Sequence, residues 1–493
     1  MKQLPPNLYR AEQTRELDRL AIEEFGISAN ILMERAGDAA FNILRQTWPD
    51  ASRIAVMCGS GNNGGDGFVI ARLAYEQGLN VTVYQVGDPV RIQGDALAAL
   101  QRMQGVDLSP VAYTEQSLDD YDVIVDALLG TGLSGEVRAP FRQAIEAINA
   151  SPAPVLAVDI PSGLNADTGM PCGLAVRADC TVSFIGLKQG MMIGKGPDYC
   201  GKILFDDLNL PAAVFERLEP AATLLAYDEL KHHLKPRERT AHKGDFGHVL
   251  IVGGNKGMSG AARLAGEAAL RSGAGLVSIA TRRKHAAQLS ATRPELMCHG
   301  IESGDALKAL SARATVIAIG PGLGQDDWAR EMLSIAMARN LPLVVDADAL
   351  KLLAKIEIER KDWILTPHPG EAAHLLHTGT AEVQQDRFAA VSKLVEKYDA
   401  TVVLKGAGSL VKHPGEKPGL CTAGNPGMAS AGMGDVLTGV IAALVAQGMG
   451  QAEAARLGVC LHAEAGDLAI RGIGVRGLLA GDIMSPLRRL VNP

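Results

Sequence analysis

A short glycine-rich segment near the end of the chain combines two groups that phosphoryl transfer requires. It reads Ala-Gly-Met-Gly-Asp at residues 431–435 and precedes an apolar run, residues 436–449, that predicts a helix. Backbone N–H groups of residues 432–434 would point outward at the start of this helix, where the dipole and unpaired donors favour a phosphate. Asp435 could accept the proton of a hydroxyl group that attacks the phosphate. Taken alone, the pentapeptide also fits a tight turn in which Asp435 caps the helix.

A second candidate phosphate site follows a predicted strand at residues 401–404. The segment Lys405-Gly406-Ala407-Gly408-Ser409 offers a cation, backbone donors and a hydroxyl group to a polyphosphate. A plain β-turn has the same pattern, but the glycine-rich helix start downstream favours a nucleotide site. Further glycine turns follow other predicted strands, at residues 253–262, 321–324 and 368–371. His368 alone also fits a core or turn histidine.

Near the start of the chain, a predicted strand at residues 53–58 leads into a glycine-rich segment. The segment, Gly-Ser-Gly-Asn-Asn-Gly-Gly-Asp-Gly at residues 59–67, satisfies the dinucleotide pattern G-x-G-x-x-G, and a helical pattern begins at Phe68. The match is weak, because it contains three polar side chains that a pyrophosphate turn does not need: Asn62, Asn63 and Asp66. The next strand ends without a convincing ribose-binding acid. The segment therefore favours a ligand-binding loop over a generic glycine turn.

Three further loops, at residues 126–136, 159–163 and 185–190, follow predicted strands. Open α/β sheets bind ligands at the carboxyl ends of their strands, so these loops are expected to share one site. Three oxygen donors could converge there around a cation: Asn63, Asp126 and Ser162. Asp159 and Lys188 could supply acid-base chemistry if burial and each other's field shift their pKa values. Each residue alone also fits a cap, a turn or a surface ion pair.

Two successive α/β series position these residues. After helical stretches at residues 11–25 and 28–47, strands are predicted at 53–58, 80–86, 122–126, 155–159 and 180–185. A second series has strands at 247–252, 276–280, 315–319, 343–346, 363–366 and 401–404, and it ends in helices near 436–448, 451–471 and 478–490. Such alternation predicts mostly parallel sheets covered on both faces. Prolines and charges near 220–235 predict a boundary between a domain at residues 1–220 and one at 228–493.

The composition argues against several classes of function. The chain has 493 residues, of which 47% are hydrophobic and 21% charged, and its net charge of −7 comes from interspersed acids and bases. We therefore expect a small-molecule protein with no nucleic-acid partner. The seven cysteines include no C-x-x-C, which argues against zinc and suits a reducing compartment. There is no signal-peptide core and no apolar stretch long enough to span a membrane, so we expect a cytoplasmic protein without a membrane partner.

The first series resembles the NAD(P)H-hydrate epimerase family across about residues 10–215. The resemblance rests on three motifs, Gly-Asn-Asn-Gly-Gly-Asp-Gly, Asp-Ala-Leu-Leu-Gly-Thr-Gly and Asp-Ile-Pro-Ser-Gly-Leu. It implies a Rossmann-like three-layer α/β/α fold, a potassium ion at Asn63, Asp126 and Ser162, and a catalytic Asp159. Lys188 as its partner is our own inference. The positions implied to bind the hydrated nucleotide are Asn62, Asn63, Gly64, Gly65, Asp66, Gly130, Thr131, Gly132, Leu133, Ser134, Gly135, Glu136 and Asp159.

The second series has neither G-x-x-x-x-G-K-[ST] nor the H-R-D and D-F-G motifs of protein kinases. Its layout resembles the ribokinase-like superfamily. The motifs His-Lys-Gly-Asp-Phe-Gly, His-Pro-Gly-Glu and Asn-Pro-Gly-Met-Ala-Ser-Ala-Gly-Met-Gly-Asp resemble the NAD(P)H-hydrate dehydratase family over roughly residues 235–490. The resemblance implies that Ala261, Gly322, His368 and Asp435 contact the hydrated nicotinamide nucleotide. It implies an adenine-nucleotide site at Lys405, Gly406, Ala407, Gly408, Ser409 and Gly434.

Together the two resemblances imply a bifunctional enzyme of metabolite repair. Water can add across the C5–C6 double bond of the reduced nicotinamide ring, giving R and S epimers at C6 of hydrated NADH and NADPH. The first domain is expected to interconvert the epimers, and the second to dehydrate the S form with ADP, giving AMP and phosphate. We expect Asp435 to deprotonate the C6 hydroxyl group, while the glycine anion site and Mg²⁺ stabilise the transferring phosphoryl group. The phosphorylated intermediate then eliminates phosphate.

Two alternatives remain open at this stage, and the nucleotide is open as well. A vitamin or sugar kinase with an appended Rossmann-like ligand-binding domain would share the Gly-Met-Gly-Asp segment, but would release a stable phosphorylated product. A nucleotide-sensing protein would bind ligands at both glycine loops without turnover. Two-domain members of the family typically use ADP, which favours ADP over ATP. We also expect a homo-oligomer.

Overall fold

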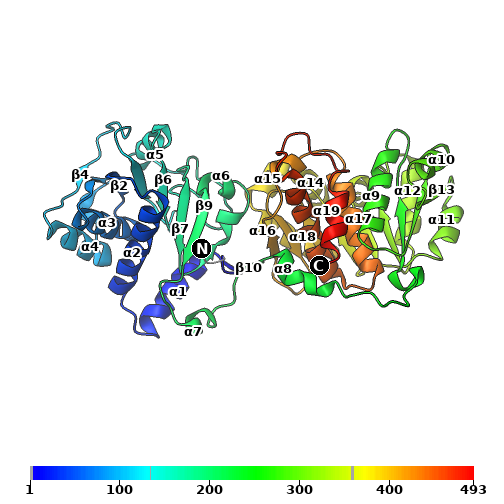
Figure 1. Ribbon diagram of the computed structural model, residues 1–493, viewed down its shortest axis with the longest axis horizontal. Helices are drawn as coiled ribbons and strands as arrows, with labels where there is room; N and C mark the ends of the chain where they lie inside the picture. The colour runs from blue at the N-terminus through cyan, green and yellow to red at the C-terminus, as the bar shows by residue number, and fades with distance from the viewer. Residues whose placement is uncertain (1–3, 134, 357–359) are drawn as a thin grey trace. The chain divides into compact units, whose positions relative to one another are not determined.

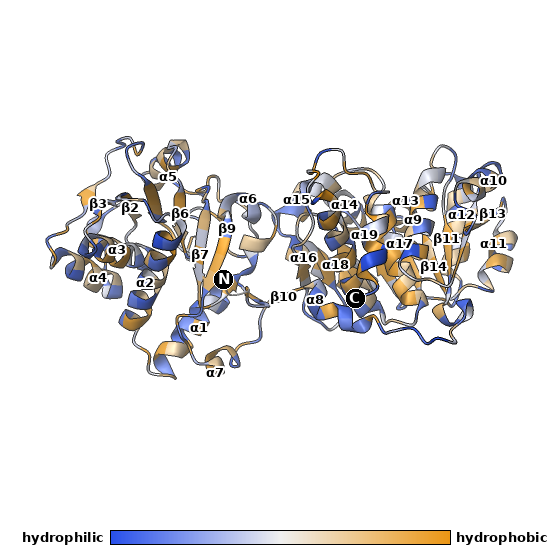
Figure 2. Cartoon of the chain, in the orientation of Figure 1, coloured by the Kyte–Doolittle hydropathy of each residue, from blue (hydrophilic) through white to orange (hydrophobic). Residues whose placement is uncertain are grey.

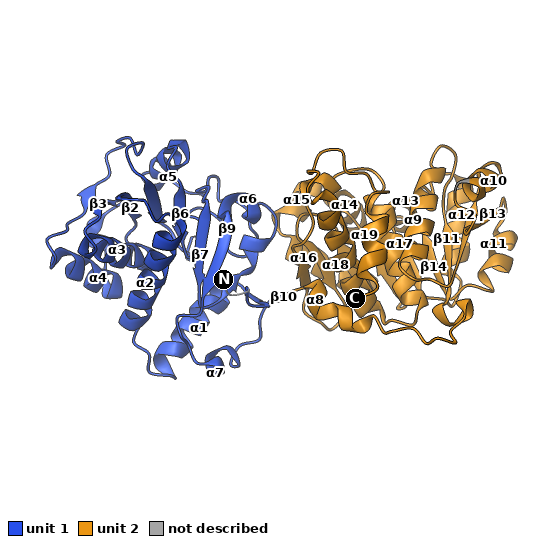
Figure 3. Ribbon diagram, in the orientation of Figure 1, with its two compact units in different colours: residues 1–223 blue, residues 224–493 orange. Residues whose placement is uncertain are grey.

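The computed structural model describes residues 4–133, 135–356 and 360–493. The chain divides into two compact units, residues 1–223 (unit 1) and residues 224–493 (unit 2), shown in Figure 3. Each unit has its own sheet, helices and core (Figure 1). Within the described ranges, no helix combines the length and apolarity that crossing a lipid bilayer requires.

Unit 1 is built around a parallel sheet. Every neighbouring pair in it is parallel. Helices α2 (Ala29–Thr47), α3 (Asn62–Glu76) and α4 (Gly94–Gln104) contribute to the core on one face, and α5 (Phe141–Ala150) packs on the other. This arrangement confirms the predicted three-layer α/β/α fold. The strand order is β4 (Val111–Ala112), β3 (Asn80–Gln85), β2 (Arg53–Cys58), β5 (Val123–Ala127), β6 (Val155–Val158), β7 (Cys180–Phe184) and β9 (Lys202–Asp206).

The central strands of unit 1 are apolar on both faces, as their continuous hydrophobic sequences predict. In β2, Ile54 and Val56 belong to the core under α2 and α3, whereas Ala55 and Met57 belong to the core under α5. Successive side chains of a strand point to opposite faces, so a strand buried on both sides must be apolar throughout. The strands β4 and β9 carry no such pattern, because they lie at the edges and are partly exposed.

Helix α3 begins at Asn62 and not at Phe68, so the polar residues of the glycine-rich segment form its first turns. Glycine is a poor helix former, which explains why the sequence predicts a loop there. The packing leaves no room for side chains. A Cβ at Gly64 would lie 2.0 Å from the carbonyl oxygen of Gly59, and one at Gly65 would lie 2.6 Å from a methionine of α2.

Unit 2 contains a mostly parallel sheet with an antiparallel edge. Neighbouring strands from β13 to β17 are parallel, whereas β17, β18 and β19 pair antiparallel. Helices α9 (Ser259–Arg271), α17 (Met433–Ala446) and α18 (Gln451–Ile470) contribute to the core on one face. The strand order is β13 (Met297–Gly300), β12 (Leu276–Thr281), β11 (His248–Val252), β14 (Val316–Ile319), β15 (Leu343–Val345), β16 (Trp363–Leu365), β17 (Thr401–Leu404), β18 (Ser409–Lys412) and β19 (Gly419–Cys421).

Helix α17 is the most apolar element at the centre of unit 2, and Figure 2 shows it largely in orange. It begins three residues before the predicted start, so the phosphate-site pentapeptide supplies its N-cap and first turn. Gly432 is the N-cap, with a φ of +91° that favours glycine. The helix ends early because Gly448, at a φ of +87°, turns the chain and the Met449 N–H bonds the Leu444 carbonyl at 3.2 Å.

The last helix, α19 (Met484–Leu490), is shorter than predicted. The sequence predicts a helix over residues 478–490, but the first part of this range forms turns. There the Leu479 N–H donates to the Asp482 carboxylate at 2.9 Å, and this side-chain bond competes with a helical one.

Candidate functional site

Unit 1 contains a cavity of about 580 Å³ where the strands end at their carboxyl termini. The loops after β2, β5, β6 and β7 all contribute to it, as the sequence predicts for an open α/β sheet. Helix α1 (Ala11–Glu23) forms another part of its wall. The predicted site residues among its lining are Asn62, Asn63, Asp66, Gly130, Thr131, Gly132, Leu133, Asp159 and Lys188.

Asp159 and Lys188 form a buried ion pair in this cavity. Asp159 directly follows β6 and has a φ of +66°, a left-handed conformation that is uncommon outside glycine. The Lys188 side chain is only 2% exposed, and its ammonium group contacts the Asp159 carboxylate. It also donates to Ser183 Oγ at 3.2 Å and to the Phe184 carbonyl at 3.1 Å. These bonds hold the charged lysine in one place beside the carboxylate.

Two further carboxyl groups, Asp66 and Asp18, line the same cavity. Burial, followed by the charges of Asp159 and Asp18, raises the pKa of Asp66 well above its ordinary value. Burial also raises the pKa of Asp18 to about 7, although the nearby Lys188 ammonium opposes the shift. Sequence analysis missed Asp18. The available signal was a carboxylate beside the apolar stripe of an amphipathic helix, next to Leu17.

The residues predicted to hold a cation come from three elements: Asn63 from the first turn of α3, Asp126 from β5 and Ser162 from the turn after β6. Asp126 is fully buried, and it accepts hydrogen bonds from Ser162 Oγ at 2.6 Å and from the Ser162 N–H at 2.8 Å. Burial raises the pKa of Asp126 to about 6 despite these bonds. The Asn63 side chain is buried with neither polar atom hydrogen-bonded, and it lies against Gly130. A buried amide group without a hydrogen-bond partner destabilises the fold unless a ligand or ion supplies that partner.

Some predicted residues lie away from the cavity. Gly64 and Gly65 are buried where α3 packs against the backbone near Gly59 and against α2. Glu136 lies beside Gly173. Gly135 and Glu136 follow Ser134, which is outside the described residues. Close packing alone explains why glycine occupies positions 64 and 65 of α3.

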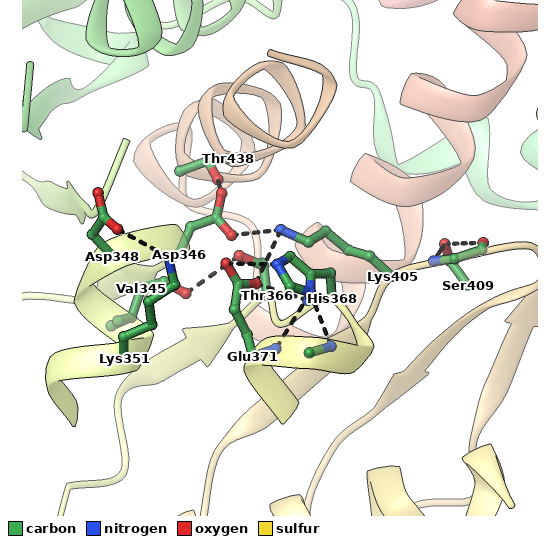
Figure 4. Close-up of polar contacts among 12 residues, drawn as sticks. Val345, Asp346, Asp348, Lys351, Thr366, His368, Glu371, Lys405, Ser409 and Thr438 are labelled. Carbon is green, nitrogen blue, oxygen red and sulfur yellow. Dashed lines mark hydrogen bonds and ion pairs between the residues drawn. The ribbon is translucent and has the colours of Figure 1, made fainter. Parts of the chain in front are cut away.

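In unit 2 the predicted cation, Lys405, reaches the start of α17 (Figure 4). Its ammonium group lies 2.6 Å from an oxygen of Asp346 and 3.8 Å from Glu371. A Cβ at Gly434 would come within 3.2 Å of the same nitrogen, so the ammonium group touches the first turn of the helix. Burial lowers the pKa of Lys405, but Asp346 and Glu371 outweigh it and raise the pKa above its ordinary value. The lysine is therefore charged.

Asp346, which directly follows β15, is a central residue that the sequence did not single out. It is 1% exposed, and its second oxygen accepts a hydrogen bond from Thr438 of α17 at 2.7 Å (Figure 4). It thus connects the end of a strand, the phosphate-site lysine and the helix. Its position in the sequence could have identified it as a site residue, because it ends a predicted strand of the sheet whose other strands lead into the glycine turns.

Asp435 lies in the first turn of α17 among other carboxylates. Its pKa is raised to about 7, chiefly by burial and then by the charge of Asp346, while Lys405 opposes the shift. A carboxyl group with this pKa is partly ionised at neutral pH. It can therefore accept a proton there, as a general base must.

His368 caps helix α14 (Pro369–Leu376). Its Nδ1 accepts hydrogen bonds from the N–H groups of Gly370, at 3.0 Å, and Glu371, at 3.3 Å. Glu371 in turn accepts from the His368 N–H at 2.8 Å, which completes a capping box. The His368 side chain is 53% exposed, so the ring serves as a cap while keeping one face open to a ligand.

The remaining predicted residues of unit 2 lie in the first turn of α9 and in the turns that follow β14 and β17. Ala261 lies at the start of α9, where a Cβ on Gly322 would be 3.2 Å from its methyl group. The segment from Lys405 to Ser409 forms a turn in which the Gly406 N–H donates to Ser409 Oγ at 3.3 Å. Beneath it, buried Arg387 donates to the Leu404 and Lys405 carbonyls, at 3.2 Å each.

A cavity of about 1050 Å³ in unit 2 lies at the other end of α17, near Gln447 and Gly448. Helices rise about 1.5 Å per residue, so it is roughly 20 Å from the Asp435 end of α17. The residues that surround it include none of the predicted site residues. The candidate site of unit 2 is therefore the charged group around Lys405 and not this cavity.

Comparison with known proteins identifies both units. The family described as YjeF-related protein N-terminus matches residues 29–190, and the family described as NAD(P)H-hydrate dehydratase matches residues 249–489. The chain is 51% identical to the bifunctional NAD(P)H-hydrate repair enzyme Nnr of Coxiella burnetii, covering 99% of each chain. It is 44% identical to the enzyme of the same name from Escherichia coli, covering 99% of this chain and 95% of the other.

A solved structure also matches unit 2. The chain is similar to a ribokinase-like superfamily protein of Enterococcus faecalis, with 31% identity and a TM-score of 0.51 over 56% of this chain and 96% of the other. The similarity confirms the predicted ribokinase-like fold.

Proposed function

The chain belongs to the bifunctional NAD(P)H-hydrate repair enzymes, which join an epimerase to an ADP/ATP-dependent dehydratase, and from this premise we propose which residues perform each reaction. We assign epimerisation to residues 1–220 and dehydration to residues 228–493. The two family matches, at residues 29–190 and 249–489, support this division. The substrates are the hydrates of NADH and NADPH.

In unit 1 we assign epimerisation at C6 to the Asp159 and Lys188 pair. Asp159 is the proton-transferring carboxylate, because it lines the cavity and is held by a lysine that other bonds fix in place. Asn62, Asn63, Asp66 and the loop at residues 130–133 surround the nucleotide. We extend that loop to Ser134, Gly135 and Glu136 on the family resemblance.

Beside this cavity, a potassium ion would be bound by Asn63, Asp126 and Ser162. The fit rests on the Asn63 oxygen, which is buried without a hydrogen bond, and on the fully buried Asp126 carboxylate. Carboxylate, amide and hydroxyl oxygens are the donors that hard cations prefer. A bound potassium ion would supply positive charge for the anionic nucleotide. Asp126 and Ser162 already hold each other in position through two hydrogen bonds.

In unit 2 we assign dehydration to Asp435 and the start of α17. Asp435 takes the proton of the C6 hydroxyl group, whose oxygen then attacks the terminal phosphoryl group of the nucleotide. The backbone N–H groups around Gly434 and the Lys405 ammonium group stabilise the charge on that phosphoryl group. Phosphate then leaves C6 as a proton leaves C5, and the C5–C6 double bond of NAD(P)H is restored.

Several carboxylates crowd this site, which favours a divalent cation arriving with the nucleotide. In the described part of the chain no group of three or more His, Cys, Asp or Glu side chains is arranged as a metal site. Mg²⁺ is typically held by nucleotide phosphates and one or two carboxylates, so this arrangement fits it. Glu371, 3.8 Å from the Lys405 nitrogen, would face the ion. Mg²⁺ would supply charge neutralisation on the transferring phosphoryl group.

We propose ADP as the co-substrate, giving AMP and phosphate, with ADP at Lys405 to Ser409 and Gly434. Ala261, Gly322 and His368 contact the hydrated nicotinamide. The observation that most strongly supports this assignment is the contact between the Lys405 ammonium group and the first turn of α17. This contact places a cation and backbone donors together beside Asp435. The seven cysteines are free thiols, which supports a cytoplasmic location. We also propose a homo-oligomer.

One assay tests the assignment. Absorbance at 340 nm follows the return of NADH from separated R and S hydrates with ADP or ATP. We expect both epimers to be consumed with ADP, and more slowly with ATP. A stable phosphorylated product without NADH would instead support a ribokinase-like kinase, and binding without turnover would support a nucleotide sensor. Either result would contradict the proposal.

A further inference from the structure

We propose that Asp18, on helix α1, is a second acid-base residue of the epimerase and exchanges protons with the C6 hydroxyl group together with Asp159. This inference rests on the assignment of epimerisation to unit 1. Asp18 lies outside the motifs that identify the family and outside the matched residues 29–190.

The geometry places α1 directly on the cavity. Near its start, the Ala11 N–H donates to Asp167 at 2.7 Å. Thr14 packs so closely on Gly186, between β7 and β8 (Leu187–Lys188), that a Cβ there would come within 2.8 Å of the threonine methyl group. Arg15 reaches the Thr131 carbonyl at 3.4 Å. The helix therefore spans from the Lys188 turn to the loop after β5, and Asp18 follows Thr14 by one helical turn, on the same side.

Asp18 is partly buried and has no bonding partner that would explain its position. In the part of the chain that the structure describes, its carboxyl group makes no hydrogen bond or ion pair, unlike Asp167 and Asp159. A partly buried carboxyl group without a bonding partner contributes no stability to the fold, so a structural role does not account for it. Such groups are typical of active sites, where the substrate supplies the missing partner.

The charges around Asp18 set it apart from its neighbours. One ammonium group, Lys188, faces three carboxyl groups, Asp18, Asp66 and Asp159, and the remaining charged residues of the cavity are Arg15 and Asp95. Lys188 contacts Asp159, whereas burial and the neighbouring carboxyl groups raise the pKa of Asp66 well above its ordinary value. Asp18, with a pKa raised by burial to about 7, is the group that changes charge near neutral pH. The same cavity is thus lined by a carboxylate that is paired with a lysine and by a carboxyl group that is partly protonated near neutral pH.

This pair suits inversion at C6, a carbon bonded to the ring nitrogen and a hydroxyl group. The carboxylic acid of Asp18 gives its proton to the hydroxyl group, the C6–O bond breaks, and water leaves. The lone pair of N1 forms a C6=N1 double bond. A water molecule then adds to the other face of C6 and loses a proton to the Asp159 carboxylate. One proton has moved between the carboxyl groups, no redox change occurs, and the reverse reaction uses the same groups in exchanged roles.

The test compares Asp18→Asn with Glu12→Gln in the full-length protein. Glu12 is an exposed acid of the same helix that does not line the cavity, so its variant controls for changes to α1. We expect Asp18→Asn to lower the rate of epimerisation by about 10²-fold and to abolish its pH dependence near 7. Dehydration of pure S hydrate reports on unit 2 and should not change. Asp18→Asn epimerising within threefold of wild type, with the wild-type pH profile, would overturn the proposal.

Two further measurements distinguish a failure of the role proposed for Asp18 from a failure of the assignment of epimerisation to unit 1. Asp159→Asn should also stop epimerisation, and if it does not, the assignment of unit 1 is wrong. If Asp159→Asn is inactive while Asp18→Asn is normal, only the role of Asp18 fails. Should Asp18→Asn misfold, as judged by circular dichroism, Asp18→Glu replaces it, with a displaced pH profile supporting the role and an unchanged one overturning it.

Isotope labelling tests the proposed bond cleavage directly. In water enriched in ¹⁸O, each inversion should place one labelled oxygen at C6, because the departing hydroxyl group is replaced by solvent. Inversion without labelling would show that the C6–O bond survives and would overturn the mechanism assigned to Asp18.

Discussion

The pKa of Asp435 depends on the charges of its neighbours. A charged nucleotide that binds beside it is therefore expected to change how readily Asp435 accepts a proton. Asp346 raises the pKa of Asp435 and also pairs with Lys405 at 2.6 Å. If the nucleotide binds at Lys405, as we propose, its phosphate groups bring further negative charge to the site. Like charges disfavour ionisation of Asp435, so a cation that accompanies the nucleotide helps to keep the base ionised.

We expect Asp435→Asn to reduce dehydration by about 10²-fold or more, because the general base is lost while the backbone donors remain. Epimerisation and ADP binding should change little. The measurements are NADH recovery from S hydrate and ADP titration calorimetry. Asp327→Asn is the matched control, since Asp327 also lies in the first turn of a helix but is 99% exposed. Near wild-type dehydration by Asp435→Asn would exclude it as the base.

We expect Asp346→Asn to move the pH dependence of dehydration towards lower pH. In the native protein, Asp435 is ionised above a pKa of about 7, so kcat should fall as the pH decreases through 7. Removing the Asp346 charge removes one cause of the raised pKa, so the base stays ionised at lower pH. The KM for ADP should rise because Lys405 loses its partner. A midpoint that stays in place or rises would contradict this electrostatic account.

Sequence motifs identify site residues that lie in recognisable loops better than site residues whose surroundings come from distant segments. Asp159 and Lys405 follow strands in recognisable loops, and the structure places both at strand ends. Asp18 and Asp346 have ordinary local patterns, an acid on a helix and an acid ending a strand. Their surroundings come from segments far away in sequence, such as Lys188 for Asp18 and Thr438 for Asp346. Only the folded chain brings these groups together.

At the scale of elements, glycine-rich helix starts position the site in both units. Helix α3 follows β2 and opens with Gly61 as N-cap, and α17 opens with Gly432 as N-cap. In each case the sequence predicts a loop and then a helix, but the helix includes the glycines. Tertiary packing overrides propensity here, because the backbone approaches neighbours too closely for side chains.

We expect Gly434→Ala to weaken ADP binding about tenfold without destabilising unit 2. The new methyl group would lie 3.2 Å from the Lys405 nitrogen and would displace it from the phosphate position. Tenfold corresponds to about 1.4 kcal/mol, the size of one hydrogen bond to a charged group. Alanine is the better helix former, so the melting temperature should hold or rise.

The control for this substitution is Gly379→Ala, since a Cβ at the N-cap of α15 (Thr380–Gln385) meets nothing within 4 Å. Unchanged ADP affinity in Gly434→Ala would remove Gly434 and the first turn of α17 from the nucleotide site. A fall in affinity for both variants would point to a general effect on unit 2.

At the scale of the whole chain, the alternation of strands and helices predicts two α/β units, but not all of their edges. The core strands are long apolar runs and are recognisable in sequence. The edge strands β4 and β13 are short and largely exposed, and the antiparallel strands β18 and β19 are only four and three residues long. Edge strands bury little surface, so their sequences are weakly constrained.

Each unit should work alone if the chain is cut between residues 223 and 224. Unit 1 needs its last residues, because the Ala221 N–H donates to the Leu8 carbonyl at 2.9 Å and Gln13 bonds the Glu219 carbonyl at 2.8 Å. A fragment ending at residue 218 would lose both bonds. We therefore expect residues 1–223 to epimerise and residues 224–493 to dehydrate, since each has its own sheet and core.

Mixing the two fragments should restore NADH recovery from R hydrate, because the S epimer made by unit 1 can diffuse to unit 2. The measurement is absorbance at 340 nm with R hydrate, ADP and each fragment alone or together. Unit 2 alone should consume R hydrate only as fast as it epimerises spontaneously, and unit 1 alone should yield no NADH. If each fragment folds by circular dichroism but the mixture recovers no NADH from R hydrate while S hydrate is consumed normally, epimerisation requires more than the residues of unit 1, and the cavity at Asp159 is not sufficient for it.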